Sequence, residues 1–365
     1  MTATTAKEPD SNTNTEIRDA LILAAIGLLR YGASVRRRIA VALDELSTAL
    51  VGEIGYDALT DFKWRQLNGF MQRVGELIVK DYETIAGDMN TELIGLMNLQ
   101  IKVELGAINN SIGIDIATSS ITPQQIDLLA SNFLIEGAPS AEWWARAGTT
   151  TSNSFADIVR RSIARGETNA DIVARMRDVG GLMPTALTQA TALVRTSVQA
   201  AANEIRLRIF QSNKELFDGI QWVSTLDSRT TPICQALDGL VWDNDFNPVG
   251  HSHEFPGPTA HWGCRSTQVP VLKKWADLLD DKNIADKLDT YEAEHPGTRA
   301  SVDGQVADSI TYERWLSSRP VSAQKEILGV GKWELWNSGK LSFTDLINND
   351  NRPLSLAQLI AKYGS

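Results

Sequence analysis

Residues 222–242 read W-V-S-T-L-D-S-R-T-T-P-I-C-Q-A-L-D-G-L-V-W, and residues 260–266 read A-H-W-G-C-R-S after a polar loop broken by Gly and Pro. Residues 222–266 together hold both cysteines of the chain and three of its four histidines, namely Cys234, His251, His253, His261 and Cys264. Two interpretations explain the cluster. The first is a metal knuckle, in which thiolates and imidazoles converge on one tetrahedral ion. The second is a small, loop-rich β module that uses Cys and His as ordinary packing and capping residues.

The residues around the cluster predict β-strands. From Ile220 onward, alternate residues suit the two faces of a strand, and Asp238-Gly239 is a strong turn signal before a return strand at residues 240–242. Residues 267–272 predict the strand that closes the module. In this interpretation Cys234 lies on the hairpin, and the short turn from His261 to Cys264 supplies two further ligands.

The pattern W-x-S-T-x-D-x-R-T-x-x-x-C-x-x-L-D-G, followed by H-x-x-C-R, resembles the Mu F-like family of phage head morphogenesis proteins, also called minor head or minor capsid proteins. The motif residues are Trp222, Asp227, Arg229, Cys234, Asp238, Gly239, His261, Cys264 and Arg265. The segment A-L-V-R-T-S-V-Q-A-A-A-N-E-I at residues 192–205 and the C-terminal order Y-x-x-W-L … P-L-S-L-A-Q-L also resemble the family. The resemblance therefore spans roughly residues 150–365.

The family commonly has Cys at the positions of Thr231 and Ser266, so the resemblance implies that a four-thiolate site is not available in this chain. If a metal is bound, we expect structural Zn²⁺ with three ligands from Cys234, His261 and Cys264. We take His253 as the fourth ligand, with His251 as its alternative. A disulfide between the two cysteines and plain packing of two thiols are the other interpretations.

The composition is that of a globular protein, with 43% hydrophobic and 22% charged residues. The net charge of −10 argues against a protein that coats DNA, which needs clustered Lys and Arg. The longest apolar run, residues 20–29, is too short to cross a bilayer, so we expect no membrane anchor. Two cysteines in 365 residues fit synthesis in the reducing cytoplasm of a host cell.

The order of patterns predicts an α+β fold that is predominantly α-helical. It begins with long N-terminal helices, continues with a central helical domain and the β-hairpin Cys/His module, and ends in a helical tail. The expected divisions are a disordered leader (1–14), a helical docking region (15–150), the helical part of the head-morphogenesis domain (151–219), a small β module with the Cys/His knuckle (220–272) and a helical C-terminal region (273–365).

Local signals predict where several helices begin and end. Thr122 and Thr168 each precede a helix with a Gln or Asp three residues later, as in a capping box. We expect Gly32 to end the first helix, so that the triplet Arg36, Arg37 and Arg38 lies in the first turn of a second one. We also expect a polar break at residues 148–151 and a Gly/Ser/Asp linker near 296–309.

The resemblance implies a virion protein of low copy number that acts in procapsid and head assembly near the portal. Its expected partners are portal and major capsid or scaffolding proteins, and phage DNA is a further one, with Arg36, Arg37 and Arg38 as candidate contacts to nucleic acid or a partner. The alternative is a zinc-dependent nuclease or an injected effector. The sequence contains no H-E-x-x-H, no G-x-S-x-G and no Gly-rich phosphate loop, so we expect no enzymatic turnover and no catalytic residues.

Overall fold

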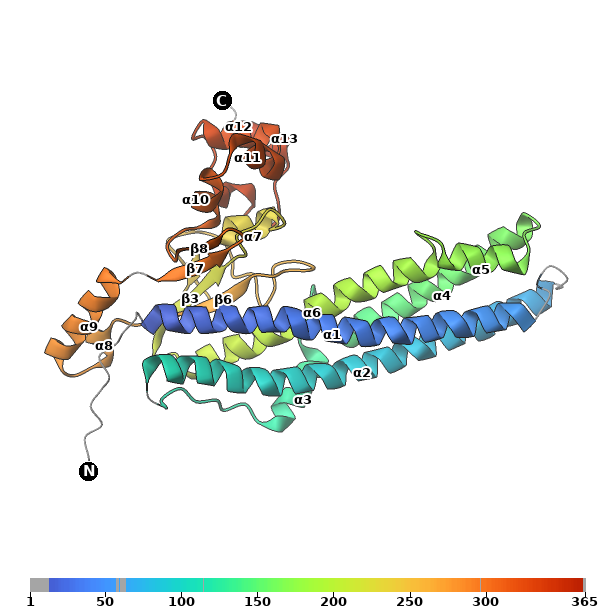
Figure 1. Cartoon of the computed structure of the whole chain (residues 1–365), viewed down its shortest axis with the longest axis horizontal. Coiled ribbons are helices and arrows are strands. Elements are labelled where there is room, and N and C mark those ends of the chain that lie inside the picture. The colour runs from blue at the N-terminus through green and yellow to red at the C-terminus, as the bar shows by residue number, and fades with distance from the viewer. Residues whose placement is uncertain (1–12, 57–58, 60–63, 114, 296, 364–365) are drawn as a thin grey trace. The chain divides into compact units, whose positions relative to one another are not determined.

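The computed structural model describes residues 13–56, 59, 64–113, 115–295 and 297–363, and helices dominate it (Figure 1). Residues 1–12 of the expected leader lie outside the described residues, and α1 begins at Thr13. The helices with 25 residues or more are α1 (Thr13–Tyr56), α2 (Trp64–Ile112), α4 (Ser140–Ala164) and α6 (Leu182–Ser212). Small antiparallel sheets accompany them, so the predicted α+β, predominantly helical class is confirmed.

The chain forms two compact units. The first contains Met1–Gly27, Leu99–Ser120 and Ala202–Ser365, and the second contains Leu28–Asn98 and Ile121–Ala201. Among the described residues, no helix is long and apolar enough to span a membrane.

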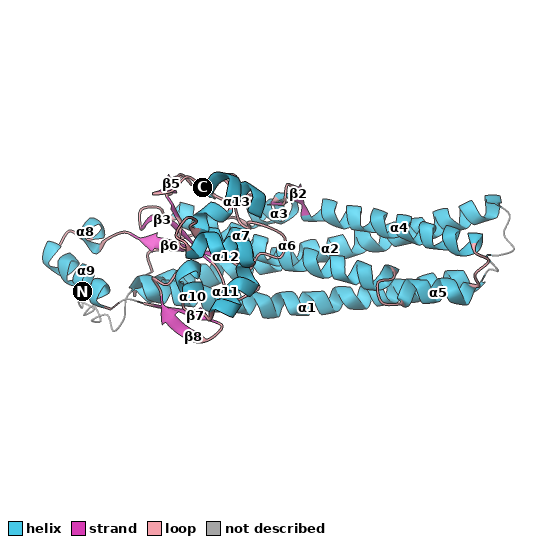
Figure 2. Ribbon diagram, turned by 90° about the horizontal axis from the view of Figure 1, so that it is seen from above, coloured by secondary structure: helices cyan, strands magenta, loops and turns pink. Residues whose placement is uncertain are grey.

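The second unit is helical apart from a two-strand ribbon, β1 (Leu134–Ile135) with β2 (Ala138–Pro139). Its part of α1 buries one apolar face, made of Val35, Ile39, Leu43, Leu46 and Leu50. α1 and α2 run lengthwise beside each other in both views (Figure 1, Figure 2). Thr122 and Thr168 cap α3 (Pro123–Asn132) and α5 (Asn169–Arg177) with full capping boxes, as predicted.

The prediction that Gly32 ends the first helix is wrong, because α1 continues through it to Tyr56. A Cβ on Gly32 would contact Val198 of α6 at 3.8 Å, so this residue lies where another helix packs closely. A glycine inside a helix costs about 1 kcal/mol relative to alanine and does not by itself end the helix. The Arg36–Arg38 triplet consequently lies in the middle of α1 and not in the first turn of a second helix.

The expected break at residues 148–151 is also wrong, because α4 runs through it without interruption. A Cβ on Gly148 would come within 2.9 Å of the Tyr82 Cβ, and the Tyr82 hydroxyl forms a 3.0 Å hydrogen bond with Thr151 Oγ1. The Thr149 hydroxyl donates to the carbonyl of Ala145, one turn earlier in the helix. Gly148 and its threonines therefore fit α4 against α2.

The first unit holds a four-stranded antiparallel sheet in the order β5-β4-β3-β6. Its strands are β3 (Phe217–Val223), β4 (Val241–Trp242), β5 (Pro248–Val249) and β6 (Thr267–Leu272). The predicted return strand and closing strand are confirmed, since β4 and β6 both pair with β3. The segment between β3 and β4 differs from a simple hairpin, because Pro232–Leu237 forms the short helix α7.

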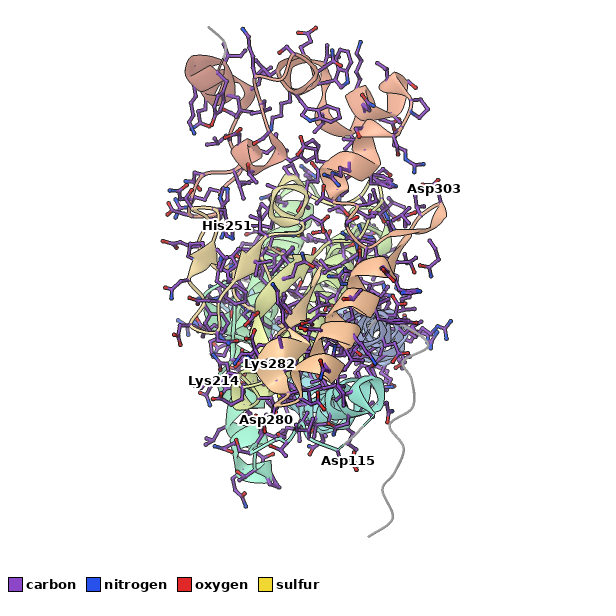
Figure 3. All side chains as sticks on the ribbon, turned by 90° about the vertical axis from the view of Figure 1, so that its left-hand side faces the viewer. Asp115, Lys214, His251, Asp280, Lys282 and Asp303 are labelled. Atoms are coloured by element: carbon purple, nitrogen blue, oxygen red, sulfur yellow. The ribbon has the colours of Figure 1, made fainter. Side chains whose placement is uncertain are left out.

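The C-terminal elements of this unit are mainly short helices. They are α8 (Trp275–Leu278), α9 (Lys282–Glu294), α10 (Tyr312–Ser317), α11 (Val321–Leu328), α12 (Val330–Asn337), a 3₁₀ helix (Phe343–Leu346) and α13 (Leu356–Tyr363). The linker expected near 296–309 is instead an antiparallel hairpin of β7 (Thr298–Ser301) and β8 (Gly304–Ala307), with Asp303 at its tip (Figure 3). A buried arginine, Arg299, anchors this hairpin to the rest of the unit.

One hydrophobic core joins the β module to the C-terminal helices. In Figure 1, α7 lies between the strands β3 and β6 and the helices α10 to α13. The buried members of the core come from both regions: Trp222, Leu226, Cys234, Leu237, Trp242, Cys264, Tyr312, Trp315, Leu316, Phe343 and Leu346. The Cys/His window is therefore part of a core that the C-terminal residues complete.

Candidate functional site

Two short local structures position the sulfur atoms. Thr231 is the N-cap of α7 and its side chain accepts a hydrogen bond from the Cys234 N–H, while Pro232 occupies the first helical position. This Thr-Pro pair is a standard helix start, and it puts Cys234 on a helix. Cys264 closes a tight turn, in which its N–H donates to the His261 carbonyl at 3.1 Å and Gly263 has a φ of +70°.

The structure brings Cys234, His261 and Cys264 together, with their ligand atoms all within 4.8 Å of one another. The two Sγ atoms are 3.7 Å apart and not bonded, and Cys234 Sγ is 3.1 Å from His261 Nε2. Both thiols are buried, with exposed fractions of 2% and 1%. Three of the four ligands predicted from the sequence therefore share one place in the fold.

The ring of His261 is held in a defined orientation. Its Nδ1 is 2.8 Å from the Trp262 carbonyl oxygen, which can only accept, so Nδ1 carries a proton. In the neutral ring this leaves Nε2 with a lone pair, and Nε2 lies 2.8 Å from Thr231 Oγ1 as well as close to the Cys234 thiol. Two potential donors, a hydroxyl and a thiol, thus approach the same nitrogen.

The two thiols have different acidities. Burial raises the pKa of Cys234 well above its ordinary value, and the hydrogen bond and charge of Cys264 act in the same direction. The hydrogen bond from Cys234 lowers the pKa of Cys264, with help from His261, and this outweighs its burial. The two pKa shifts thus run in opposite directions, because Cys264 is the hydrogen-bond acceptor of the pair.

His253 does not join this group, although the sequence suggested it as the fourth ligand. Its Nδ1 donates to the Asn348 carbonyl at 3.2 Å, and its own carbonyl accepts from the Trp242 indole at 2.9 Å. His251, the alternative, donates from Nε2 to the Val241 carbonyl and accepts at Nδ1 from the His253 N–H. Burial lowers the pKa of His251, so it is a neutral packing residue against Trp242.

Asp227 and Arg265 form a bidentate ion pair. The two guanidinium nitrogens donate to the two carboxylate oxygens at 2.7 Å each, whereas Arg229 reaches Asp227 at 3.4 Å and is 80% exposed. Burial alone would raise the pKa of Asp227, but the hydrogen bonds and charge of Arg265 outweigh it and hold the pKa at about 2. Arg265 therefore braces the turn after β3, whereas Arg229 contributes mainly through its backbone N–H, which donates to Asp227 at 3.0 Å.

Asp238 is the centre of a buried polar network. It ends α7 before Gly239, which has a φ of +86°, so its turn position agrees with the sequence. Its carboxylate also accepts from the Ser224 N–H at 2.6 Å, from the Tyr312 N–H at 2.6 Å and from Arg299 at 3.0 Å. Asp238 thereby joins the end of β3, the β7 strand and the start of α10.

Residues 153–269 match the model of the family described as Phage Mu protein F like protein. This segment is similar to that family. The resemblance seen in the sequence is confirmed over this range, which includes all three clustered ligands and both Asp227 and Asp238. No curated protein and no solved structure matches the chain.

The motif residues have hydrogen-bond partners that the sequence analysis did not name as site residues. Arg299 and Tyr312 lie beyond residue 269, yet they satisfy Asp238, and the Tyr312 hydroxyl donates to the Asp227 carbonyl at 2.8 Å. Thr231 was treated only as a missing cysteine, but its hydroxyl is a contact of His261. The Thr-Pro signal was the clue available for Thr231, and Tyr312 is the first residue of the Y-x-x-W-L pattern, whereas no quoted pattern marks Arg299.

The arginine triplet lies outside the segment that matches the Mu F-like family, on α1. Arg38 forms an ion pair with Glu92 of α2 at 2.6 Å, and Arg36 Nε donates to the Gly32 carbonyl one turn earlier at 3.4 Å. The side chain of Arg37 is exposed. At least two of the three side chains thus have contacts within the same helical unit.

Proposed function

We propose that this chain is a phage minor head protein that joins the procapsid during head assembly and sits near the portal. The observation that carries the proposal is the match of residues 153–269 to the Mu F-like family, together with the motif residues that first indicated it. The family is one of structural head proteins, so this proposal places the chain in the virion and gives it the role of a building part.

The contacts made by the motif residues support a role in holding shape. Trp222 and Asp238 are buried, Asp227 is bound by Arg265, and the two thiols lie in the hydrophobic core. Side chains that recognise or transform a substrate need to reach it, whereas these make contacts within the domain. The motif thus specifies how the turns around β3 and β6 are assembled.

The helical residues 15–150 are the proposed docking region for portal, major capsid or scaffolding proteins. Exposed aliphatic side chains on its long helices, such as Leu29 and Val41 on α1, offer apolar contact area to such a partner. DNA is the less favoured partner, because the net charge is −10 and Arg38 is already paired with Glu92. Contact with DNA in this proposal is limited to Arg36 and Arg37.

Imaging of procapsids and mature heads tests the location. We expect density that fits the helices of this chain at the portal vertex, and we expect particles made without the chain to lack that density and to mature poorly. A matched preparation that carries Arg36→Ala and Arg37→Ala separates DNA contact from docking, since docking through apolar surface should survive it. Absence of the chain from both procapsids and mature heads would contradict the proposal.

The competing function is a zinc-dependent nuclease or an injected effector, and the observation in its favour is the Cys/His group with three ligands. Incubation of the purified chain with double-stranded and single-stranded DNA and Zn²⁺, Mg²⁺ or Mn²⁺ distinguishes the two. We expect the wild-type chain and the His295→Ala variant to cleave no more DNA than a reaction without protein. Cleavage that disappears in His261→Ala would replace our proposal with the competing one.

A further inference from the structure

We propose that Cys234, His261 and Cys264 bind one Zn²⁺ ion, with an oxygen in the fourth position from the Thr231 hydroxyl or a water that it holds. This inference does not depend on the role of the chain in a phage head. It also replaces the ligand set expected from the sequence, because His253 is engaged by Asn348 and is not part of the group.

The distances between the donor atoms fit such an ion. Zn–S bonds of about 2.3 Å and Zn–N bonds of about 2.0 Å at tetrahedral angles place two sulfurs about 3.8 Å apart and a sulfur about 3.5 Å from a nitrogen. The two Sγ atoms are 3.7 Å apart, and Cys234 Sγ is 3.1 Å from His261 Nε2. Both distances lie within a few tenths of an ångström of these values, and all three donor atoms lie within 4.8 Å of one another.

The orientation of His261 is that of a metal ligand. Zinc-bound imidazoles usually donate their second ring N–H to a carbonyl or carboxylate, which fixes the tautomer and directs the other nitrogen at the ion. Here Nδ1 donates to the Trp262 carbonyl, and Nε2 faces the thiol of Cys234. Simple packing of a histidine would not require its lone pair to lie among two sulfurs and a hydroxyl.

The thiols also come from separate parts of the chain. Cys234 lies on α7 and Cys264 on the turn before β6, 30 residues later. An ion at this position would tie α7 to the turn that precedes β6, inside a core where both sulfurs are shielded from water. Structural zinc sites act in this way, by closing loops that have little regular structure.

A substitution at Thr231 tests the proposal by an increase in zinc affinity, whereas substitutions of the ligands test it by a decrease. Its Oγ1 is 2.8 Å from His261 Nε2, so a sulfur at this position would lie next to the same ion. A neutral oxygen is a weaker zinc ligand than a thiolate. Replacement by cysteine, Thr231→Cys, is therefore expected to convert a two-thiolate site into a three-thiolate site.

The experiment uses the full-length chain, purified under reducing conditions and freed of metal with a chelator. Zn²⁺ alone is titrated in competition with a chromophoric chelator, and Co²⁺ alone is bound in its place to record the thiolate-to-metal charge-transfer band. We expect one ion per chain, a charge-transfer band that reports two thiolates, and binding weakened more than about 100-fold in Cys264→Ser and His261→Ala.

Matched variants decide the ligand set. Affinity should be unchanged in His295→Ala, which alters an exposed histidine on another element, and in His253→Gln, which alters the ligand predicted from the sequence. Thr231→Cys should bind Zn²⁺ at least about tenfold more tightly and increase the charge-transfer band. This gain keeps the test decisive even if a loss variant fails to fold.

Three results would overturn the proposal. The first is failure of both the wild-type chain and Thr231→Cys to bind either ion under reducing conditions. The second is weakening by His253→Gln as large as that by His261→Ala, which would show a different ligand set. The third is a purified chain with no titratable thiols and a mass two hydrogens lower, because a Cys234–Cys264 disulfide would then occupy the site.

Discussion

Replacement of Asp238 by Asn should destabilise the fold by about 3–5 kcal/mol, the usual cost of removing one partner from a buried ion pair. Asp238 has a side chain that is 0% exposed, and its partner Arg299 is 4% exposed. In Asp238→Asn the guanidinium keeps its charge in the core without a counter-ion. The new amide also replaces one acceptor oxygen by an NH₂ donor, although the carboxylate accepts from three donors, the Ser224 N–H, the Tyr312 N–H and Arg299.

The control is Asp303→Asn, in the hairpin that carries Arg299. Asp303 also pairs with an arginine, Arg319, at 2.6 Å, but the two side chains are 48% and 25% exposed, so the expected cost is below about 1 kcal/mol. Urea unfolding followed by tryptophan fluorescence measures both variants, since Trp222 and Trp315 lie in the same core. The double variant Asp238→Asn/Arg299→Met should recover part of the loss, because it removes the unpaired charge.

Equal unfolding free energies for Asp238→Asn and Asp303→Asn would refute this reasoning. That result would mean that the network around Asp238 opens to water in solution. If the double variant recovers none of the lost unfolding free energy, the cost comes from the lost hydrogen bonds of Ser224 and Tyr312 and not from the unpaired charge on Arg299.

The other predictions concern acid stability and helix packing. Because the pKa of Asp227 is held at about 2, below its ordinary value of 3.8, Arg265 stabilises the fold above about pH 4, and this contribution is lost as the pH falls toward 2. The difference in urea midpoint between wild type and Arg265→Ala should therefore shrink over that range, and a constant difference would contradict the assignment. Gly148→Ala should cost about 1–3 kcal/mol by overpacking against Tyr82, whereas Gly95→Ala, with open space at its Cβ, should stabilise by up to about 1 kcal/mol in the same thermal unfolding assay. Tyr82→Phe should lose about 1 kcal/mol with its hydrogen bond to Thr151, and no loss would show that α4 does not pack there as described.

Local signals in the sequence predicted the elements that depend on local contacts. The caps at Thr122 and Thr168 work within four residues, and both helices begin where the caps indicate. The strand at residues 267–272 was also found, because its β-branched and aliphatic residues are visible without knowledge of its partner. These elements need little information from the rest of the chain.

The helix ends predicted at two glycines were wrong, because the contacts that favour glycine there come from other helices. Gly32 and Gly148 look like helix ends in a linear sequence, but both sit inside helices, opposite Val198 and Tyr82. A glycine that lets two helices approach cannot be distinguished from a glycine that ends a helix until the second helix is placed. The hairpin at 298–307 was missed although Asp303-Gly304 is a local turn signal, and only its anchor depends on distant residues, since Arg299 pairs with Asp238 61 residues away.

The sequence predicted which types of residue form the candidate site, but it did not predict how they are arranged. Clustering in the sequence identified Cys234, His261 and Cys264, and the structure brings them together. It could not choose among the histidines, because His253 and His251 lie in the same loop and differ only in which backbone carbonyls they meet, those of Asn348 and Val241. The domain boundaries at 150/151, 219/220 and 272/273 stay predictions.

The contacts of Asp238 show which residues complete the fold of the segment that matches the Mu F-like family. The match ends at residue 269, but the carboxylate inside it is satisfied by Arg299 and by the backbone of Tyr312. A buried carboxylate without donors costs several kcal/mol, which is a large part of the total stability of a typical domain. Without the residues after 269, Asp238 would lose its hydrogen bonds from Arg299 and Tyr312, and the core residues that Trp315 and Phe343 cover would be exposed. The cooperative unit therefore includes the C-terminal helices, and the shape that the motif specifies is completed by residues the family match does not reach.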